Sequence, residues 1–165
     1  MTHDEIYGEY EPICAISREL FTECFIECPE IFEEHQKELK EYGGSSISDG
    51  STYELVESAG NHLFLVVRDV NGKICGYASY IVGDSLHFED CIVAHSDLIY
   101  LSPAYRGYGV ASDLIGTAEY LLSKEFDVDY IQLNGKFGDE CVEKLASSKG
   151  YNPQEIIYSK DIKNG

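Results

Sequence analysis

Residues 101–122, which read LSPAYRGYGVASDLIGTAEYLL, constrain the fold more than any other stretch. A strand-like start passes through a proline turn into Gly107 and Gly109, and then into an amphipathic helix expected over residues 107–125. The N-terminus of a helix carries unpaired N–H donors and a partial positive charge. Glycines leave room for an anion to approach those donors, and Arg106 adds a cation beside them. The stretch therefore predicts an anion-binding turn, with a merely tight strand-to-helix turn as the alternative.

Two common phosphate-binding motifs do not fit this turn. No G-K-[ST] sequence follows the glycines, which excludes a Walker P-loop. Ser112 stands where a G-x-G-x-x-G motif needs its last glycine, so the turn is not typical of a Rossmann dinucleotide site.

Hydrophobic periodicity and turn residues predict an α/β fold with a mixed sheet flanked by helices. Asn71 and Gly72 separate two β-branched, apolar runs, which is a strong hairpin signal. The connection over residues 43–54 is rich in glycine and serine. We expect helices over 12–25, 29–42, 107–125 and 139–150, strands over 62–70, 73–83, 91–102, 129–134 and 155–162, and a frayed strand near Ile6.

The chain is strongly acidic, with a formal net charge of −18. Residues 1–60 carry 15 acidic and 3 basic side chains, so the excess is greatest in that part. Such a surface repels nucleic acid and attracts cations, although it also simply keeps a protein soluble. The sequence has no apolar run long enough for a membrane span and no signal-peptide pattern near its start, so we expect a cytoplasmic protein. Six scattered cysteines are then reduced, and no metal-ligand spacing is present.

Arg106, Gly109 and Ala111 fit the pattern R/Q-x-x-G-x-G/A, which resembles the acetyl-coenzyme A motif of the GNAT (GCN-related N-acetyltransferase) superfamily. The resemblance extends over roughly residues 62–162, through GKICGYASYIVGD, YIQLN and KLASSKGYNPQ. It implies the GNAT acyltransferase fold, with a central mixed sheet and about four helices. The length of 165 residues favours one domain over residues 1–165. The resemblance implies that 1–60 form acceptor-side helices and 61–165 form the cofactor-binding core.

The resemblance implies acetyl-CoA as the co-substrate and assigns its contacts. In the family, backbone amides of the motif cradle the pyrophosphate, the end of the preceding strand pairs with the pantetheine arm, and an asparagine after the next strand contacts the cofactor. Here these positions are Arg106, Gly107, Tyr108, Gly109, Val110 and Ala111 for the loop, Tyr100, Leu101 and Ser102 for the strand, and Asn134 for the asparagine.

The family transfers the acetyl group by direct attack of an amine on the thioester. The tyrosine that often serves as its general acid is absent, because Ala146 occupies the position. His95 and Asp97 lie two apart on a predicted strand, hence on one face, and are the candidate bases. Glu89 and Asp90 are further candidates. Either His95 or Asp97 is also compatible with a purely structural role.

The acidic N-terminal part favours a cationic primary amine as acceptor, either a small molecule or a protein, with no direct binding of nucleic acid or membranes. The alternative is a catalytically inactive acidic binding protein that mimics nucleic acid or inhibits a basic partner. A longer acyl donor and a homodimer formed through an exposed sheet edge are also open.

Overall fold

The computed structural model describes residues 14–41, 50–136, 138–160 and 162. The chain divides into two compact units, residues 1–134 and 135–165. The first unit contains β1 (Cys14–Arg18), α1 (Phe21–Glu27), α2 (Pro29–Glu41), α3 (Ser51–Ser58), β2 (His62–Asp69), β3 (Ile74–Asp84), β4 (Ile92–Leu101), the 3₁₀ turn η2 (Pro103–Tyr105), α4 (Val110–Glu125) and β5 (Tyr130–Gln132). The second unit contains α5 (Glu140–Ser148).

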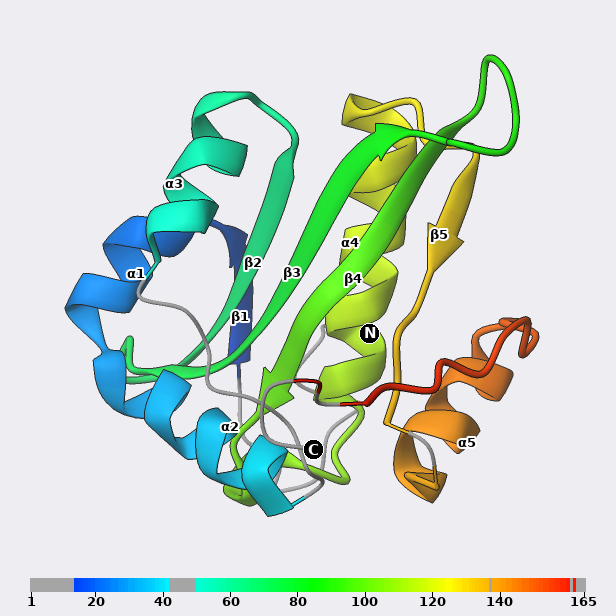
Figure 1. The fold of residues 1–165 in the computed structure, drawn as a ribbon. Coiled ribbons are helices and arrows are strands. Elements are labelled where there is room, and N and C mark those ends of the chain that lie inside the picture. Colours follow the sequence, from blue (N-terminus) through cyan, green and yellow to red (C-terminus); the bar gives the residue numbers. More distant parts are fainter. Residues whose placement is uncertain (1–13, 42–49, 137, 161, 163–165) are drawn as a thin grey trace, which may run out of the picture. The chain divides into compact units, whose positions relative to one another are not determined.

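The sheet has five strands in the order β1-β2-β3-β4-β5 (Figure 1). All neighbours are antiparallel except β4 and β5, which run parallel and are joined by α4. The predicted hairpin joins β2 and β3, and Gly72 takes the left-handed conformation at φ 79° that the turn requires. Asp69 fixes this turn because its carboxylate accepts hydrogen bonds from the backbone N–H groups of Asn71 and Lys73.

Helices cover both faces of the sheet, with α4 on one face and α1, α2 and α3 on the other (Figure 1). Alternate residues of β2 divide between the faces: Leu63, Leu65 and Val67 pack toward α4, whereas Phe64 and Val66 pack toward α1 and α2. Because both faces are covered, β2 reads as an almost unbroken apolar run. Both cores include residues of β3 and β4.

The expected helix over residues 12–25 is wrong in its first half, since Cys14–Arg18 forms β1, antiparallel to β2. In this segment Cys14 and Ile16 pack against the core while Ala15 and Ser17 are exposed, which is the period of two of a strand. The helix begins only at Phe21. Residues 51–58, placed partly in a loop by their polar neighbours, form α3. The strand expected near Ile6 and residues 42–49 lie outside the described residues.

The second unit confirms the predicted helix and contradicts the final strand. Asp139 caps α5 by accepting hydrogen bonds from two backbone N–H groups, and Gly150 ends it at φ 85°. Residues 151–160 have no regular secondary structure, and Ile156, Ile157 and Tyr158 are exposed. Such β-branched and aromatic side chains are typical of a strand, but a strand forms only beside a partner strand, and residues 151–160 have none in the described sheet. Among the described residues, no helix has the length and apolar character required to span a bilayer.

Candidate functional site

The site is built around the point where β4 and β5 separate. The two strands pair only over Val93–His95 and Tyr130–Gln132, whereas β4 continues to Leu101 (Figure 1). Asn134 marks the separation, because its backbone N–H donates to Ser96 Oγ at 2.7 Å and its side-chain amide donates to the Ser96 carbonyl at 2.6 Å. Beyond this fork, in the described part of the chain, β4 pairs with β3 alone. An extended ligand can add to such an edge by backbone hydrogen bonds.

Asn134 therefore has a structural role that its sequence position does not reveal. Both of its bonds go to Ser96, so it fixes the apex of the fork. A contact with the cofactor, as the resemblance implies, stays a prediction.

The glycine loop lies between the end of β4 and the N-terminus of α4, as predicted. Gly107 and Gly109 have φ angles of 86° and 81°, and a Cβ at either position meets open space. The first α-helical hydrogen bond of α4 runs from the Asp113 N–H to the Gly109 carbonyl. No side chain caps the helix, so the N–H groups of its first turn remain available to a ligand. This geometry is suited to a phosphate group, and Val110 and Ala111 supply two of those N–H groups.

Arg106 does not extend freely toward the loop. Its Nε donates to the Leu101 carbonyl at 2.7 Å, and its Nη2 bonds to Glu38 Oε1, also at 2.7 Å. The guanidinium carbon lies 5.5 Å from the centre of the Tyr100 ring. Arg106 thus connects the end of β4 to α2. The Glu38 carboxylate also offsets the positive charge of Arg106, which the sequence predicts to attract an anion.

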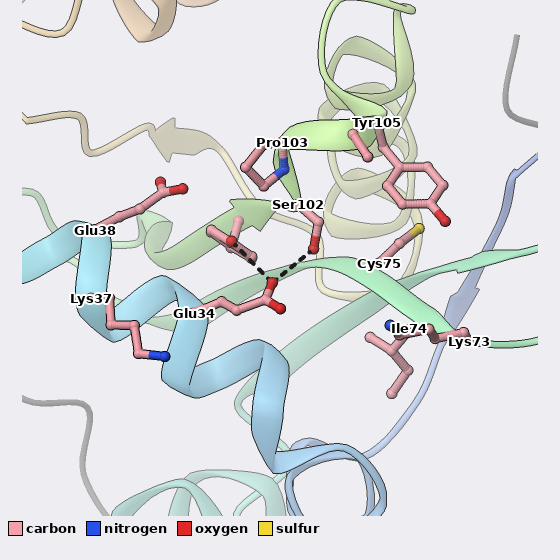
Figure 2. Close-up of a pocket in the computed structure, with 11 residues that line it drawn as sticks. Glu34, Lys37, Glu38, Lys73, Ile74, Cys75, Ser102, Pro103 and Tyr105 are labelled. Carbon is pink, nitrogen blue, oxygen red and sulfur yellow. Dashed lines mark hydrogen bonds between the residues drawn. The ribbon is translucent and has the colours of Figure 1, made fainter.

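At the end of β4 Tyr100 and Leu101 are buried, and the Leu101 carbonyl already accepts the hydrogen bond from Arg106 Nε. Glu34 on α2 points toward Ser102 and accepts hydrogen bonds from its hydroxyl at 3.2 Å and from the Tyr100 hydroxyl at 3.4 Å (Figure 2). A cavity of about 630 Å³ lies here, between α2 and the ends of β3 and β4. It is lined by carboxylates of α2 and by Lys37 and Lys73, and it lies on the β3 side of β4 rather than at the fork.

Asp97 lies just past the apex of the fork, on a β-bulge. Ser96 pairs with Tyr80 and Leu98 with Ser79, which leaves Asp97 as an extra residue without a partner on β3. Its side chain is exposed, and its Oδ2 accepts a hydrogen bond from the Tyr53 hydroxyl of α3. His95 is also exposed but pairs with Ile81 on one side and Gln132 on the other. Of the two predicted bases, Asp97 is the one at the open part of the fork.

Behind Tyr53 lies a buried polar group that the sequence did not single out. Glu57 of α3 accepts hydrogen bonds from the Phe21 N–H and from the Thr22 hydroxyl at 2.9 Å, so it caps α1 from a neighbouring helix. His62 bonds to Ser79 Oγ at 2.8 Å. Burial lowers the pKa of His62, outweighing the opposite effects of the Glu57 and Asp97 carboxylates, so its ring is neutral at pH 7.

The sequence contains one local pattern that points to these residues. Tyr53 and Glu57 are four apart, which places them on one face if residues 51–58 form a helix. Because residues 43–54 are expected to form a loop, this helical spacing is not apparent from the sequence.

A sheet edge that opens at a bulge and ends at an uncapped helix N-terminus is suited to an extended ligand with a phosphate-bearing end. The family model for the acetyltransferase (GNAT) family matches residues 17–136. The chain therefore belongs to the GNAT family of acetyltransferases, whose co-substrate is acetyl-CoA.

Solved structures with the same fold support this assignment. A putative acetyl transferase from Pyrococcus furiosus is 23% identical, with a TM-score of 0.67 over 91% of this chain and 100% of the other. A ribosomal-protein-alanine N-acetyltransferase from Brucella melitensis biovar Abortus 2308 is 18% identical, with a TM-score of 0.68 over 91% and 99%. AAC(6')-Iy in complex with the bisubstrate analog CoA-S-monomethyl-acetylneamine is 14% identical, with a TM-score of 0.66 over 90% and 98%. No curated protein sequence matches the chain.

Proposed function

We propose that this protein is an N-acetyltransferase that transfers the acetyl group of acetyl-CoA to a primary amine on a cationic acceptor. The observation that carries the proposal is the fork between β4 and β5, with Asp97 near its apex and the glycine loop beyond its open end. From Asp97 to Ser102, one residue beyond the end of β4, an extended chain spans roughly 16 Å. A single extended thioester can thus place its phosphates at the loop and its acetyl group beside Asp97.

In the proposed reaction the amine nitrogen attacks the thioester carbonyl, a C–N bond forms and the C–S bond breaks. Asp97 accepts the proton that the amine loses, and backbone N–H groups along the open edge of β4 stabilise the oxyanion. His95, which lies beside the apex, is the second candidate base. An ordinary thiol has a pKa of about 8.5, so the coenzyme A thiolate is a fair leaving group and needs no general acid to depart. The released thiolate then takes a proton from water. This route needs no tyrosine at position 146.

The acceptor is proposed to be cationic because the acidic excess of residues 1–60 lies in the part of the chain that forms α1, α2 and α3. Several of these carboxylates are already engaged: Glu19 and Glu27 bind Arg68, and Glu38 binds Arg106. Exposed carboxylates that remain, such as Glu54, provide the attraction. Two structural neighbours act on amines according to their names, a ribosomal-protein alanine in one case and an aminoglycoside in the other. Protein and small-molecule amines are both candidates.

The test is a panel of amines incubated with acetyl-CoA, with release of free coenzyme A thiol as the readout. The panel holds polyamines, aminoglycosides, and peptides with a free N-terminus or lysine. We expect turnover with at least one cationic amine and a fall in kcat of about 100-fold or more for Asp97→Asn, the usual contribution of a general base. Asp84→Asn, an equal change at the far end of β3, is the matched control and retains full activity.

Calorimetry separates the possible failures. Acetyl-CoA binding without turnover of any amine would favour the inactive binding protein. An absence of acetyl-CoA binding would refute the proposal as a whole. The single-domain organisation over residues 1–165 and the homodimer remain predictions, which proteolysis and sedimentation test.

A further inference from the structure

Tyr53 is held close to the proposed base by contacts from two elements. Its hydroxyl donates a hydrogen bond to Asp97 Oδ2, across 44 residues of sequence. Its ring stacks on Phe21 of α1, with the ring centroids 3.9 Å apart and the planes 17° apart. Phe21 is fully buried, so this ring is a fixed support. Tyr53 is therefore oriented by packing, independently of its hydrogen bond.

The hydroxyl of Tyr53 stays protonated under all conditions in which amines are acetylated. Burial raises the pKa of this phenol, and the hydrogen bond to Asp97 raises it further. Tyr53 consequently acts as a hydrogen-bond donor and not as a base. Its donation occupies Oδ2 of the Asp97 carboxylate and leaves Oδ1 for another partner.

Asp97 needs such a partner because of its place in the sheet. A bulge residue lacks the cross-strand pairing that fixes its neighbours Ser96 and Leu98. Proton transfer requires the carboxylate within hydrogen-bond reach of the amine, and a displacement of about 1 Å can lower a rate 100-fold. The Tyr53 hydroxyl, held on α3 by packing against Phe21, restricts the movement of the Asp97 carboxylate.

We propose that Tyr53 is a positioning residue, which fixes the Asp97 carboxylate at the fork so that its unbonded oxygen accepts the proton of the acceptor amine. The inference rests on the proposed acetyltransferase function and on Asp97 as its base. In this proposal α3 contributes to catalysis by positioning the base, and Tyr53 itself contacts neither the amine nor acetyl-CoA.

The experiment compares kcat and KM for the wild type, Tyr53→Phe, Asp97→Asn and the double variant, using an amine that the wild type acetylates. Tyr53→Phe keeps the ring that stacks on Phe21 and removes only the hydroxyl. We expect kcat to fall about 10-fold with KM for acetyl-CoA unchanged, since hydrogen bonds to charged groups are the stronger ones. In the Asp97→Asn background the same change lowers kcat no further. Tyr120→Phe, on the exposed face of α4, is the control and leaves kcat unchanged.

The outcomes separate this inference from the proposed function. A wild type without activity toward any amine overturns both. An active wild type with impaired Asp97→Asn but unimpaired Tyr53→Phe overturns only the role of Tyr53. If Tyr53→Phe lowers kcat equally in both backgrounds, the residue acts through general stability rather than through Asp97, and the inference is wrong. Full activity of Asp97→Asn also overturns it.

Discussion

Gly109 and Gly72 provide a matched pair for testing the anion-binding loop. Both have φ near 80°, at 81° and 79°, and a Cβ built at either one meets no atom within 4 Å. Gly109 precedes α4, whereas Gly72 lies in the β2–β3 hairpin. Substitution by alanine therefore imposes the same backbone strain at two places, of which only one belongs to the proposed acetyl-CoA site.

The cost in stability follows from that conformation alone. An L-residue in the left-handed region costs about 1 kcal/mol or slightly more relative to glycine. For a chain of 165 residues, 1 kcal/mol corresponds to roughly 2–4 °C in Tm. We expect Gly109→Ala and Gly72→Ala each to lower Tm by about that much, and the two variants to differ little from each other.

Their effects on acetyl-CoA binding differ. The new methyl group at Gly109 occupies the open space through which a phosphate reaches the first N–H groups of α4, and strain in the loop moves those groups. We expect the Kd for acetyl-CoA, measured by calorimetry, to rise about 10-fold, the equivalent of 1.4 kcal/mol or one lost hydrogen bond to an anion. Gly72→Ala binds as the wild type does, within twofold.

Two results would refute this reasoning. Unchanged binding by Gly109→Ala means that phosphates do not approach the loop at this residue. Equal weakening by both variants means that binding responds to overall stability and not to the loop.

Three further predictions concern the surroundings of the site. Glu38→Gln removes the ion pair that offsets the charge of Arg106. Because an exposed ion pair contributes about 0.2–1 kcal/mol, calorimetry should show acetyl-CoA binding up to about 5-fold tighter. Gly76→Ala places a Cβ 2.7 Å from a side chain and 2.9 Å from the backbone of β4, so chemical denaturation should show a loss of about 1–3 kcal/mol. Hydrogen bonds from Arg68 lower the pKa of Glu19 from 4.5 to about 2. The ionised Glu19 therefore contributes fully to the stability of the folded protein above about pH 4.5, and this contribution is lost as the pH falls to 2. Glu19→Gln should flatten the dependence of Tm on pH across this interval.

The loop and the central strands could be predicted because their signals are local. Asn71 and Gly72 specify the hairpin within a few residues, and Gly109 with the apolar stripe after it specifies the start of α4. β1 could not be predicted, because Cys14–Arg18 becomes a strand only through pairing with β2, and its apolar residues also fit a helical spacing. Propensity is overridden by such tertiary contacts.

The parts of the site that the sequence does not show are contacts between distant segments. The Tyr53–Asp97 hydrogen bond spans 44 residues and depends on a bulge that no single strand encodes. The ion pair between Arg106 and Glu38 spans 68 residues. Arg106 fits the motif by sequence, yet its orientation is set by α2, which lies far from the motif in the chain.

These contacts change how the acidic charge of the protein should be interpreted. With a net charge of −18, the protein surface is expected to repel acetyl-CoA, which is itself an anion. The one arginine at the loop does not resolve this, since Glu38 already bonds to it. The backbone N–H groups of the first turn of α4 remain, and their partial charge needs no ion pair and acts within the first turn. The proposed function thus combines an anion bound at the N-terminus of α4 with a cationic acceptor attracted to the fork by exposed carboxylates. The two effects are compatible because the partial charge of the helix acts within its first turn, whereas exposed charges act over about a Debye length.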